Sequence, residues 1–78
     1  MPKNDQRSVT RAARRLNEHH LKTGAGFYPN QAAGGGRCFS ARVRRGTLQI
    51  WPGRGGSWLD VNLVTAAFTD HNGRPIFI

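Results

Sequence analysis

Residues 38–51 read CFSARVRRGTLQIW, and apolar and polar side chains alternate along both halves of this segment. A period of two is typical of strands that bury one face, so the pattern predicts strands over residues 38–44 and 47–51. A two-residue turn at Arg45-Gly46 would set each apolar residue of the first strand opposite an apolar residue of the second. The predicted pairs are Val43 with Leu48, Ala41 with Ile50, Arg42 with Gln49, and Ser40 with Trp51.

The segment before this hairpin predicts an amphipathic helix from about Val9 to Lys22. Ser8 stands at the N-cap position, where its hydroxyl can accept a hydrogen bond from a free backbone N–H, and Gly24 and Gly26 follow as a C-terminal stop. A rotation of about 100° per residue separates an apolar arc from a charged arc. The apolar arc holds Val9, Ala12, Ala13, Leu16 and His20, and the opposite arc holds Arg7, Arg11, Arg14, Arg15, Glu18 and Lys22.

Two stretches lack any periodic pattern and are expected to be irregular. Residues 1–7 are polar and are expected to form a loose N-terminal segment. Residues 23–37 contain Pro29 and three consecutive glycines at 34–36, and they are expected to form a Gly-rich loop because glycine carries a high backbone entropy cost in regular elements.

The C-terminal part of the chain predicts further strands. Alternation from Ser57 to Leu63 indicates a third strand, and a helix over residues 60–68 is the competing interpretation. Asn72-Gly73 is a strong hairpin signal, so residues 68–70 and 75–78 are expected to pair. Proline cannot donate a ladder hydrogen bond, which places Pro75 at an edge or at the start of a strand.

These elements predict an α+β fold, with one N-terminal amphipathic helix packed on a small antiparallel β-sheet of about four strands. A chain of 78 residues suffices for one small domain and buries about 60% of the surface that its unfolded form exposes. We therefore expect residues 1–78 to form a single domain. A deep active-site cleft is not expected in so small a core.

Charge is the strongest functional signal in this sequence. Twelve Lys and Arg stand against four Asp and Glu, which gives a net charge of +8, and ten of the twelve cations are Arg. The guanidinium group forms paired hydrogen bonds with phosphate and stacks on bases and aromatic rings. Nucleic acid, either DNA or RNA, is therefore the expected partner. An acidic host protein is the alternative partner, and a charged coat that only keeps the protein soluble is the third interpretation.

Other classes of function find little support in the residue pattern. The carboxylates are scattered, and the histidines and the cysteine lack the spacing of a zinc site, so we expect no catalytic residues, no cofactor and no metal. The single cysteine, Cys38, cannot form an intramolecular disulfide, which favours a reducing cytoplasm. No apolar run approaches the length of a membrane span, so no membrane contact is expected.

The expected binding residues lie on the helix and on the hairpin. A solvent-facing Trp51 would offer a stacking surface for unpaired bases, and Trp58 could join it; in the competing interpretation these tryptophans complete the core. The predicted nucleic-acid-binding residues are Arg7, Arg11, Arg14, Arg15, Lys22, Arg42, Arg44, Arg45, Trp51 and Arg54. The sequence thus predicts a non-catalytic nucleic-acid-binding protein with an Arg-rich helix and an Arg/Trp hairpin face. The alternative is a small phage- or plasmid-type module that inhibits a host protein through an acidic patch.

Overall fold

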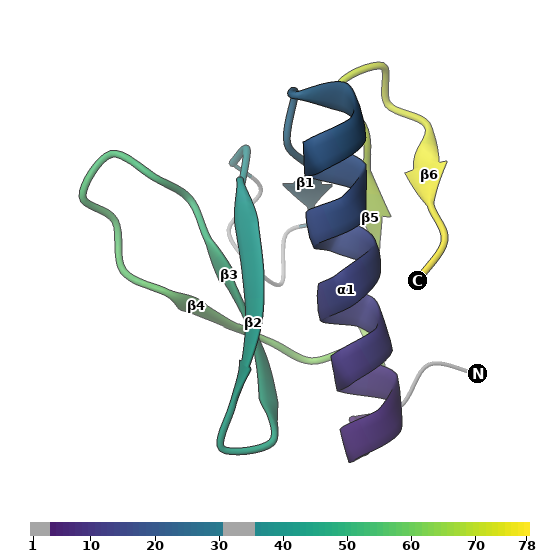
Figure 1. The fold of residues 1–78 in the computed structure, drawn as a ribbon, viewed down its shortest axis with the longest axis vertical. Helices are drawn as coiled ribbons and strands as arrows, with labels where there is room; N and C mark the ends of the chain where they lie inside the picture. Colours follow the sequence, from purple (N-terminus) through teal and green to yellow (C-terminus); the bar gives the residue numbers. More distant parts are fainter. Residues whose placement is uncertain (1–3, 31–35) are drawn as a thin grey trace.

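A computed structural model describes residues 4–30 and 36–78, and within these ranges the chain forms one helix and six short strands (Figure 1). In chain order they are α1 (Gln6–Thr23), β1 (Tyr28–Pro29), β2 (Ser40–Arg44), β3 (Thr47–Trp51), β4 (Leu59–Val61), β5 (Phe68–Thr69) and β6 (Pro75–Ile76). The expected α+β class is confirmed. No helix in the described part of the chain is long and apolar enough to cross a membrane.

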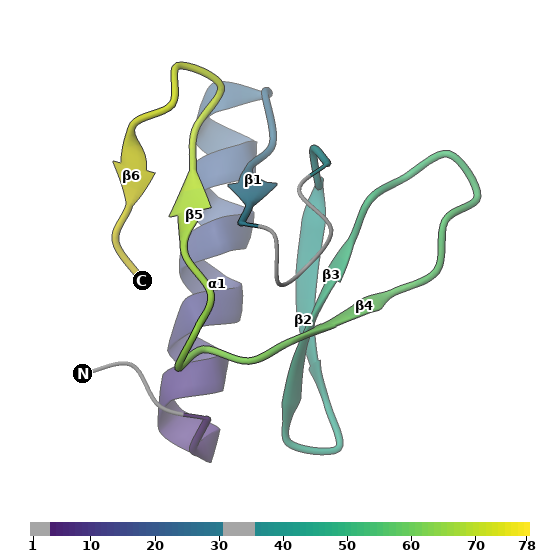
Figure 2. The same cartoon turned by 180° about the vertical axis from the view of Figure 1, so that it is seen from behind.

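The strands form two antiparallel three-stranded sheets, ordered β2-β3-β4 and β1-β5-β6, where a single sheet of about four strands was predicted. The sheet β2-β3-β4 lies to one side of α1 and β6 to the other, while β5 overlaps the helix in both views, behind it in Figure 1 and in front of it in Figure 2. The separation arises because the chain leaves the first sheet after β4 and then pairs β5 with β1, which lies far earlier in the sequence. One apolar core of helix and strand residues lies between these elements.

The N-terminus of α1 lies three residues earlier than the sequence indicated. Asp5 is the N-cap, and its carboxylate accepts a hydrogen bond of 2.7 Å from the Ser8 N–H. A carboxylate is favoured here over the Ser8 hydroxyl because it also interacts with the positive end of the helix dipole. The prediction of a loose segment over residues 1–7 was wrong for residues 4–7: Asn4 binds Asn62 and Leu63, and Gln6 and Arg7 are helical. Residues 1–3 lie outside the described ranges.

The predicted apolar arc of α1 is confirmed as its buried side. Val9, Ala12, Ala13 and Leu16 are buried, whereas His20 is only half-buried. Gly24 ends the helix in the left-handed region (φ 69°), and its N–H donates to the His20 carbonyl over 2.7 Å. Glycine is favoured at this position because it has no Cβ to clash in that conformation.

The predicted hairpin is also confirmed, in the predicted register. Val43 pairs with Leu48 and Ala41 with Ile50, and the pairing extends from Arg44–Thr47 at the turn to Ser40–Trp51. Both turn residues have positive φ, 52° at Arg45 and 77° at Gly46, which is the backbone of a type I′ turn. Arg45 therefore occupies a conformation that a side chain with a Cβ normally avoids.

The Arg45→Asn substitution is expected to stabilise the hairpin. Asparagine tolerates the left-handed region better than arginine, and Asn-Gly is the preferred type I′ pair, so the free energy of unfolding should rise by about 0.5–1 kcal/mol. Urea denaturation followed by tryptophan fluorescence measures the change. Gly46→Ala should act in the opposite direction. A destabilised Arg45→Asn variant would argue against the type I′ turn.

The Gly-rich segment is not a loop throughout. Thr23 still belongs to α1, and Tyr28–Pro29 forms β1 by pairing with β5, where Tyr28 lies opposite Thr69. Phe27 and Cys38 also exchange two backbone hydrogen bonds, of 2.9 and 2.7 Å. The loop prediction for residues 23–37 was therefore wrong for residues 23 and 27–29, because partners distant in sequence supply the pairing. Residues 31–35 lie outside the described ranges.

The C-terminal elements follow the strand interpretation. β4 pairs with β3, and a single turn at Asn62–Ala66 replaces the helix considered for residues 60–68. β5 and β6 form the predicted hairpin, with Pro75 beginning the edge strand β6. In the connecting turn, a hydrogen bond from the Arg74 N–H lowers the pKa of Asp70, and the Asn72 N–H adds a second bond. The turn is thus stabilised above the ordinary carboxyl pKa and loses this contribution as pH falls through the lowered value.

Candidate nucleic-acid interface

Strand alternation divides the side chains of the β2-β3-β4 sheet between two faces. Ala41, Leu48 and Ile50 are buried in the core, on which α1 also packs. The residues between them point the other way and form what we call the sheet platform. Its members are Arg42 on β2, Gln49 and Trp51 on β3, Asp60 on β4, and Trp58, which directly precedes β4.

A ladder of hydrogen bonds crosses the sheet platform from strand to strand. Arg42 Nε donates to Gln49 Oε1 over 2.8 Å, and Gln49 Nε2 donates to Asp60 Oδ1 over 2.8 Å. These three residues lie opposite one another in the strand register. The ladder restrains the Arg42 guanidinium, which reduces the side-chain entropy that a ligand contact would have to remove.

The two tryptophans form an aromatic cluster with Arg42 on the same face. The Arg42 guanidinium lies over the Trp58 ring, 4.0 Å from its centre, which is a close cation–π contact. The rings of Trp51 and Trp58 are 6.4 Å apart and tilted by 33°. Trp51 is 36% exposed, as its predicted outward position requires, whereas Trp58 is half-buried beneath Arg42. Neither tryptophan belongs to the buried core.

The loop after β3 is hydrogen-bonded to this aromatic cluster. Trp51 Nε1 donates to the Gly56 carbonyl over 3.1 Å, and the Gly56 N–H donates to the Gly53 carbonyl over 2.9 Å. Arg54 and Gly55 have φ of 52° and 73°, so this is a second type I′ turn centred on Arg-Gly. Arg54 is exposed at this end of the sheet, and the other Arg-Gly turn exposes Arg45 at the opposite end of β3.

The remaining predicted residues divide between two surfaces. Arg44 is exposed beside Arg45 at the hairpin turn. The helix cations are exposed on the side of α1 opposite its buried residues, away from the sheet platform, with Glu18 among them. They are Arg7, Arg11, Arg14, Arg15 and Lys22. The structure thus gathers Arg42 and Trp51 with Trp58, places Arg44, Arg45 and Arg54 at the ends of that sheet, and keeps the helix cations separate.

One residue that sequence reasoning missed controls the position of β2. Asn17 on α1 binds the backbone of Ala41 twice, since its Nδ2 donates to the carbonyl and its Oδ1 accepts from the N–H, each over 2.8 Å. Because β2 is an edge strand, these backbone groups have no strand partner on that side. Asn17 therefore fixes the strand that carries Arg42 against the helix. Its polar character and its place beside the apolar arc were the available sequence signals.

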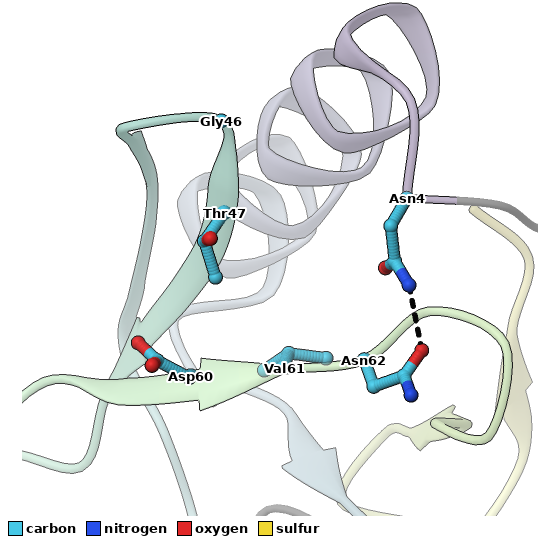
Figure 3. A pocket seen from close by; sticks show the side chains of 6 residues that line it. All are labelled: Asn4, Gly46, Thr47, Asp60, Val61 and Asn62. Atoms are coloured by element: carbon cyan, nitrogen blue, oxygen red, sulfur yellow. Dashed lines mark hydrogen bonds between the residues drawn. The ribbon is translucent and has the colours of Figure 1, made fainter.

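A hollow of about 360 Å³ lies where β4 separates from the hairpin turn (Figure 3). Asp60 and Thr47 border it on one side, and Asn4 and Asn62, joined by a hydrogen bond of 2.7 Å, border it on the other. Asp60 is the charged residue among its lining side chains. A carboxylate without a neighbouring cation repels phosphate, so this hollow is a poor candidate for the phosphate contacts.

The histidines, the carboxylates and the single cysteine of the described residues are dispersed over the fold. Within residues 4–30 and 36–78, no three His, Cys, Asp or Glu side chains lie close enough together to hold a metal ion. Burial raises the pKa of the Cys38 thiol above its ordinary value, which disfavours the reactive thiolate form.

Comparison of the chain with protein-family models, with curated proteins and with solved structures returned no match. The function therefore has to be inferred from the chemistry and the placement of the chain's own residues.

Proposed function

We propose that this protein binds single-stranded nucleic acid without catalysis, using the sheet platform as its principal surface. The observation that carries the proposal is the stacked arrangement of Arg42 on Trp58, beside an exposed Trp51. Unpaired bases stack on aromatic rings and on guanidinium planes, with about 1–3 kcal/mol for each base–aromatic contact. A duplex keeps its bases stacked internally and cannot use these surfaces.

Charge on and around the platform supports a polyanionic ligand. Arginines lie on the edge strand β2 and at both ends of the sheet, whereas Asp60 is the acidic residue on this face, where it accepts the hydrogen bond from Gln49. The arginines are Arg37, Arg42, Arg44, Arg45 and Arg54. Such a surface attracts the phosphate backbone at separations up to about one Debye length, and it orients the nucleic-acid strand along the sheet. The cations of α1 add to the long-range attraction from a neighbouring surface.

Salt dependence tests the electrostatic part of the proposal. If the five arginines on and around the sheet platform each neutralise one phosphate of a single strand, the logarithm of the association constant should fall with the logarithm of salt concentration with a slope of about −3.5. Fluorescence anisotropy with labelled single-stranded DNA, single-stranded RNA and duplex DNA measures this slope. Binding that does not respond to salt would contradict phosphate contacts.

Trp51→Ala is expected to weaken single-strand binding by about five- to a hundredfold, because it removes the exposed stacking surface. Duplex binding should change much less. Phe77→Ala is the matched control: Phe77 is 80% exposed and lies after β6, away from the platform, so its loss should leave oligonucleotide binding unchanged. Equal losses for single strands and duplexes in Trp51→Ala would contradict base stacking on the platform.

A second candidate function has one observation in its favour. An apolar hollow of about 260 Å³ runs along β6 and is lined by Pro75, Phe77 and Ile78, and a neighbouring hollow between β6 and α1 is lined by Arg15, Lys22 and Glu18. An apolar patch with a border in which cations outnumber the acid fits an acidic protein partner better than a nucleic acid. In that case Phe77→Ala would abolish capture of an acidic host protein and Trp51→Ala would not.

A further inference from the structure

A separate hollow of about 310 Å³ lies at the tryptophan end of the sheet and is lined by Gly36, Arg37, Phe39, Pro52 and Arg54. Its walls come from the segment that enters β2 and the segment that leaves β3. The two segments are joined where the Phe39 N–H donates to the Trp51 carbonyl over 3.0 Å. The backbone at the floor of this hollow is therefore bonded to the backbone of Trp51, and the Trp51 ring lies on the opposite face of the strand pair, at the same end of the sheet.

The floor of this hollow is held firmly. Phe39 packs against the His20 ring, with the ring centres 5.8 Å apart and the planes at 75°. On another side it meets the backbone of Gly53, where an added Cβ would lie 3.0 Å from the Phe39 ring. The Arg37 guanidinium lies 5.2 Å from the centre of the Phe39 ring, which positions this cation over a fixed aromatic surface.

Arg54 lines the hollow from the second Arg-Gly turn. Its φ of 52° is unfavourable for a residue with a Cβ by about 1 kcal/mol, and glycine or asparagine would form the same turn without that cost. The turn is nevertheless closed by the Gly53–Gly56 hydrogen bond and fastened to the Trp51 indole. Arg45 has the same φ in the hairpin turn, so the bond to the Trp51 indole, and not the strain, distinguishes the Arg54 turn.

Two guanidinium groups thus border one hollow without a counterion. Neither Arg37 nor Arg54 has a carboxylate partner among the residues that the structure describes. Two cationic side chains that line one hollow are stabilised when an anion binds between them. Two guanidinium groups match a phosphate monoester, which carries close to two negative charges at neutral pH and three acceptor oxygens.

We infer that this hollow binds the terminal phosphate of a nucleic-acid strand whose neighbouring base stacks on Trp51. The inference rests on the proposed function for the identity of the strand. A terminal phosphate is favoured over an internal phosphodiester because its second charge uses both arginines, and because the hollow lies at one end of the platform. The protein would accordingly prefer strands that end in phosphate.

The test compares one labelled oligonucleotide sequence with a 5′-phosphate, a 3′-phosphate or hydroxyl groups at both ends. A phosphate at one end should tighten binding to the wild-type protein about tenfold, as expected for charge-assisted hydrogen bonds from two arginines. Arg54→Gly keeps a residue suited to positive φ and removes the guanidinium, so it should abolish the preference without disrupting the turn. Arg37→Ala should have the same effect.

Arg45→Gly is the matched control, because it removes the same charge from the same type of turn at the other end of the sheet. It should weaken all three oligonucleotides equally and leave the preference for the phosphorylated end intact. Oligonucleotides that bind equally well with any terminus would overturn the terminal-phosphate site while leaving single-strand binding in place.

A second measurement separates the site from the proposed function. Titration with inorganic phosphate should shift the Nε–H signals of Arg37 and Arg54 in an NMR spectrum of the wild-type protein, and the Arg45 signal should not move. If these shifts occur although no oligonucleotide binds, the phosphate site stands and the proposed single-strand function fails. Absence of the shifts would overturn the site independently of any oligonucleotide.

Discussion

Phe27→Ala is expected to lower the free energy of unfolding by about 3–5 kcal/mol, which is the usual loss for truncating a fully buried phenylalanine. Phe27 has no exposed surface, and its ring packs edge-on against Phe68 with the ring centres 5.9 Å apart. Its backbone pairs with Cys38, the residue that leads into β2. Phe27 therefore links the two sheets, since its ring packs against β5 and its backbone pairs with the segment that leads into β2.

The free energy expected to be lost in Phe27→Ala is a large fraction of the total stability of the domain. Domains are stable by about 5–15 kcal/mol, and one of this size is expected near the lower end of that range. Phe27→Ala should consequently be mostly unfolded at physiological temperature. Urea denaturation at low temperature, followed by circular dichroism, would measure the difference.

Phe77→Ala again supplies the control, since it removes the same side chain from an exposed position. Its stability should lie within about 0.5 kcal/mol of the wild-type value. Similar losses for the two phenylalanine variants would contradict the burial of Phe27 and, with it, the described linkage between the sheets.

Asn17→Ala is expected to lower the free energy of unfolding by about 2–4 kcal/mol. The substitution leaves the part-buried N–H and carbonyl of Ala41 without their partners, and each unsatisfied group costs about 1–3 kcal/mol. The loss should be concentrated at β2, where hydrogen exchange of the backbone amides would report earlier opening than in the β5–β6 hairpin. Asn72→Ala is a suitable control because Asn72 is exposed and contributes its backbone N–H to the turn.

Asn17→Asp distinguishes the paired hydrogen bond from simple packing. A carboxylate can accept from the Ala41 N–H but would face the Ala41 carbonyl with a second acceptor oxygen, whereas a protonated carboxyl restores the donor. The new carboxyl should therefore have a raised pKa in the folded state. Its stabilising contribution is complete below the unfolded-state pKa and is lost as pH rises through the folded-state value. A pH-independent difference from the wild type would contradict the paired geometry.

The consequences of Asn17 extend to the proposed interface. Arg42 lies next to Ala41 on β2, so a loosened edge strand also releases the Arg42 guanidinium from Trp58. At temperatures where Asn17→Ala remains folded, its single-strand affinity should fall although Asn17 lies outside the sheet platform. Wild-type affinity in the folded variant would indicate that the Arg42–Trp58 stack forms independently of the helix.

Elements with local periodicity were predictable from the sequence. The β2–β3 hairpin combines an alternating pattern with a two-residue turn, and these together determine its register without reference to the rest of the chain. The buried side of α1 was likewise predictable, because a helix with one apolar arc is stable only when that arc faces the core. The N-cap was misassigned because Asp5 and Ser8 are both good capping residues, and the helix-dipole interaction that favours the Asp5 carboxylate is small.

Parts of the candidate site were predictable for the same reason. The outward positions of Arg42 and Trp51 follow from the alternation of the hairpin, and the exposed cations of α1 follow from the helical arc. The hollow bordered by Arg37 and Arg54 was not predictable, because its two walls are adjacent only after β2 and β3 have paired.

The sequence by itself determined the amphipathic helix, the hairpin register and the excess of arginine, since each depends on residues that are close neighbours in the chain. Only the tertiary structure decided that β1 pairs with β5, that Asn17 holds Ala41, and that Arg42 stacks on Trp58. The β1–β5 pairing was not predictable because a strand of two residues is too short to show an alternating pattern. The contacts of Asn17 and Arg42 were not predictable because an amide or a guanidinium group can bind many different partners. Which partner each of them meets depends on how the helix and the sheets pack around their common core.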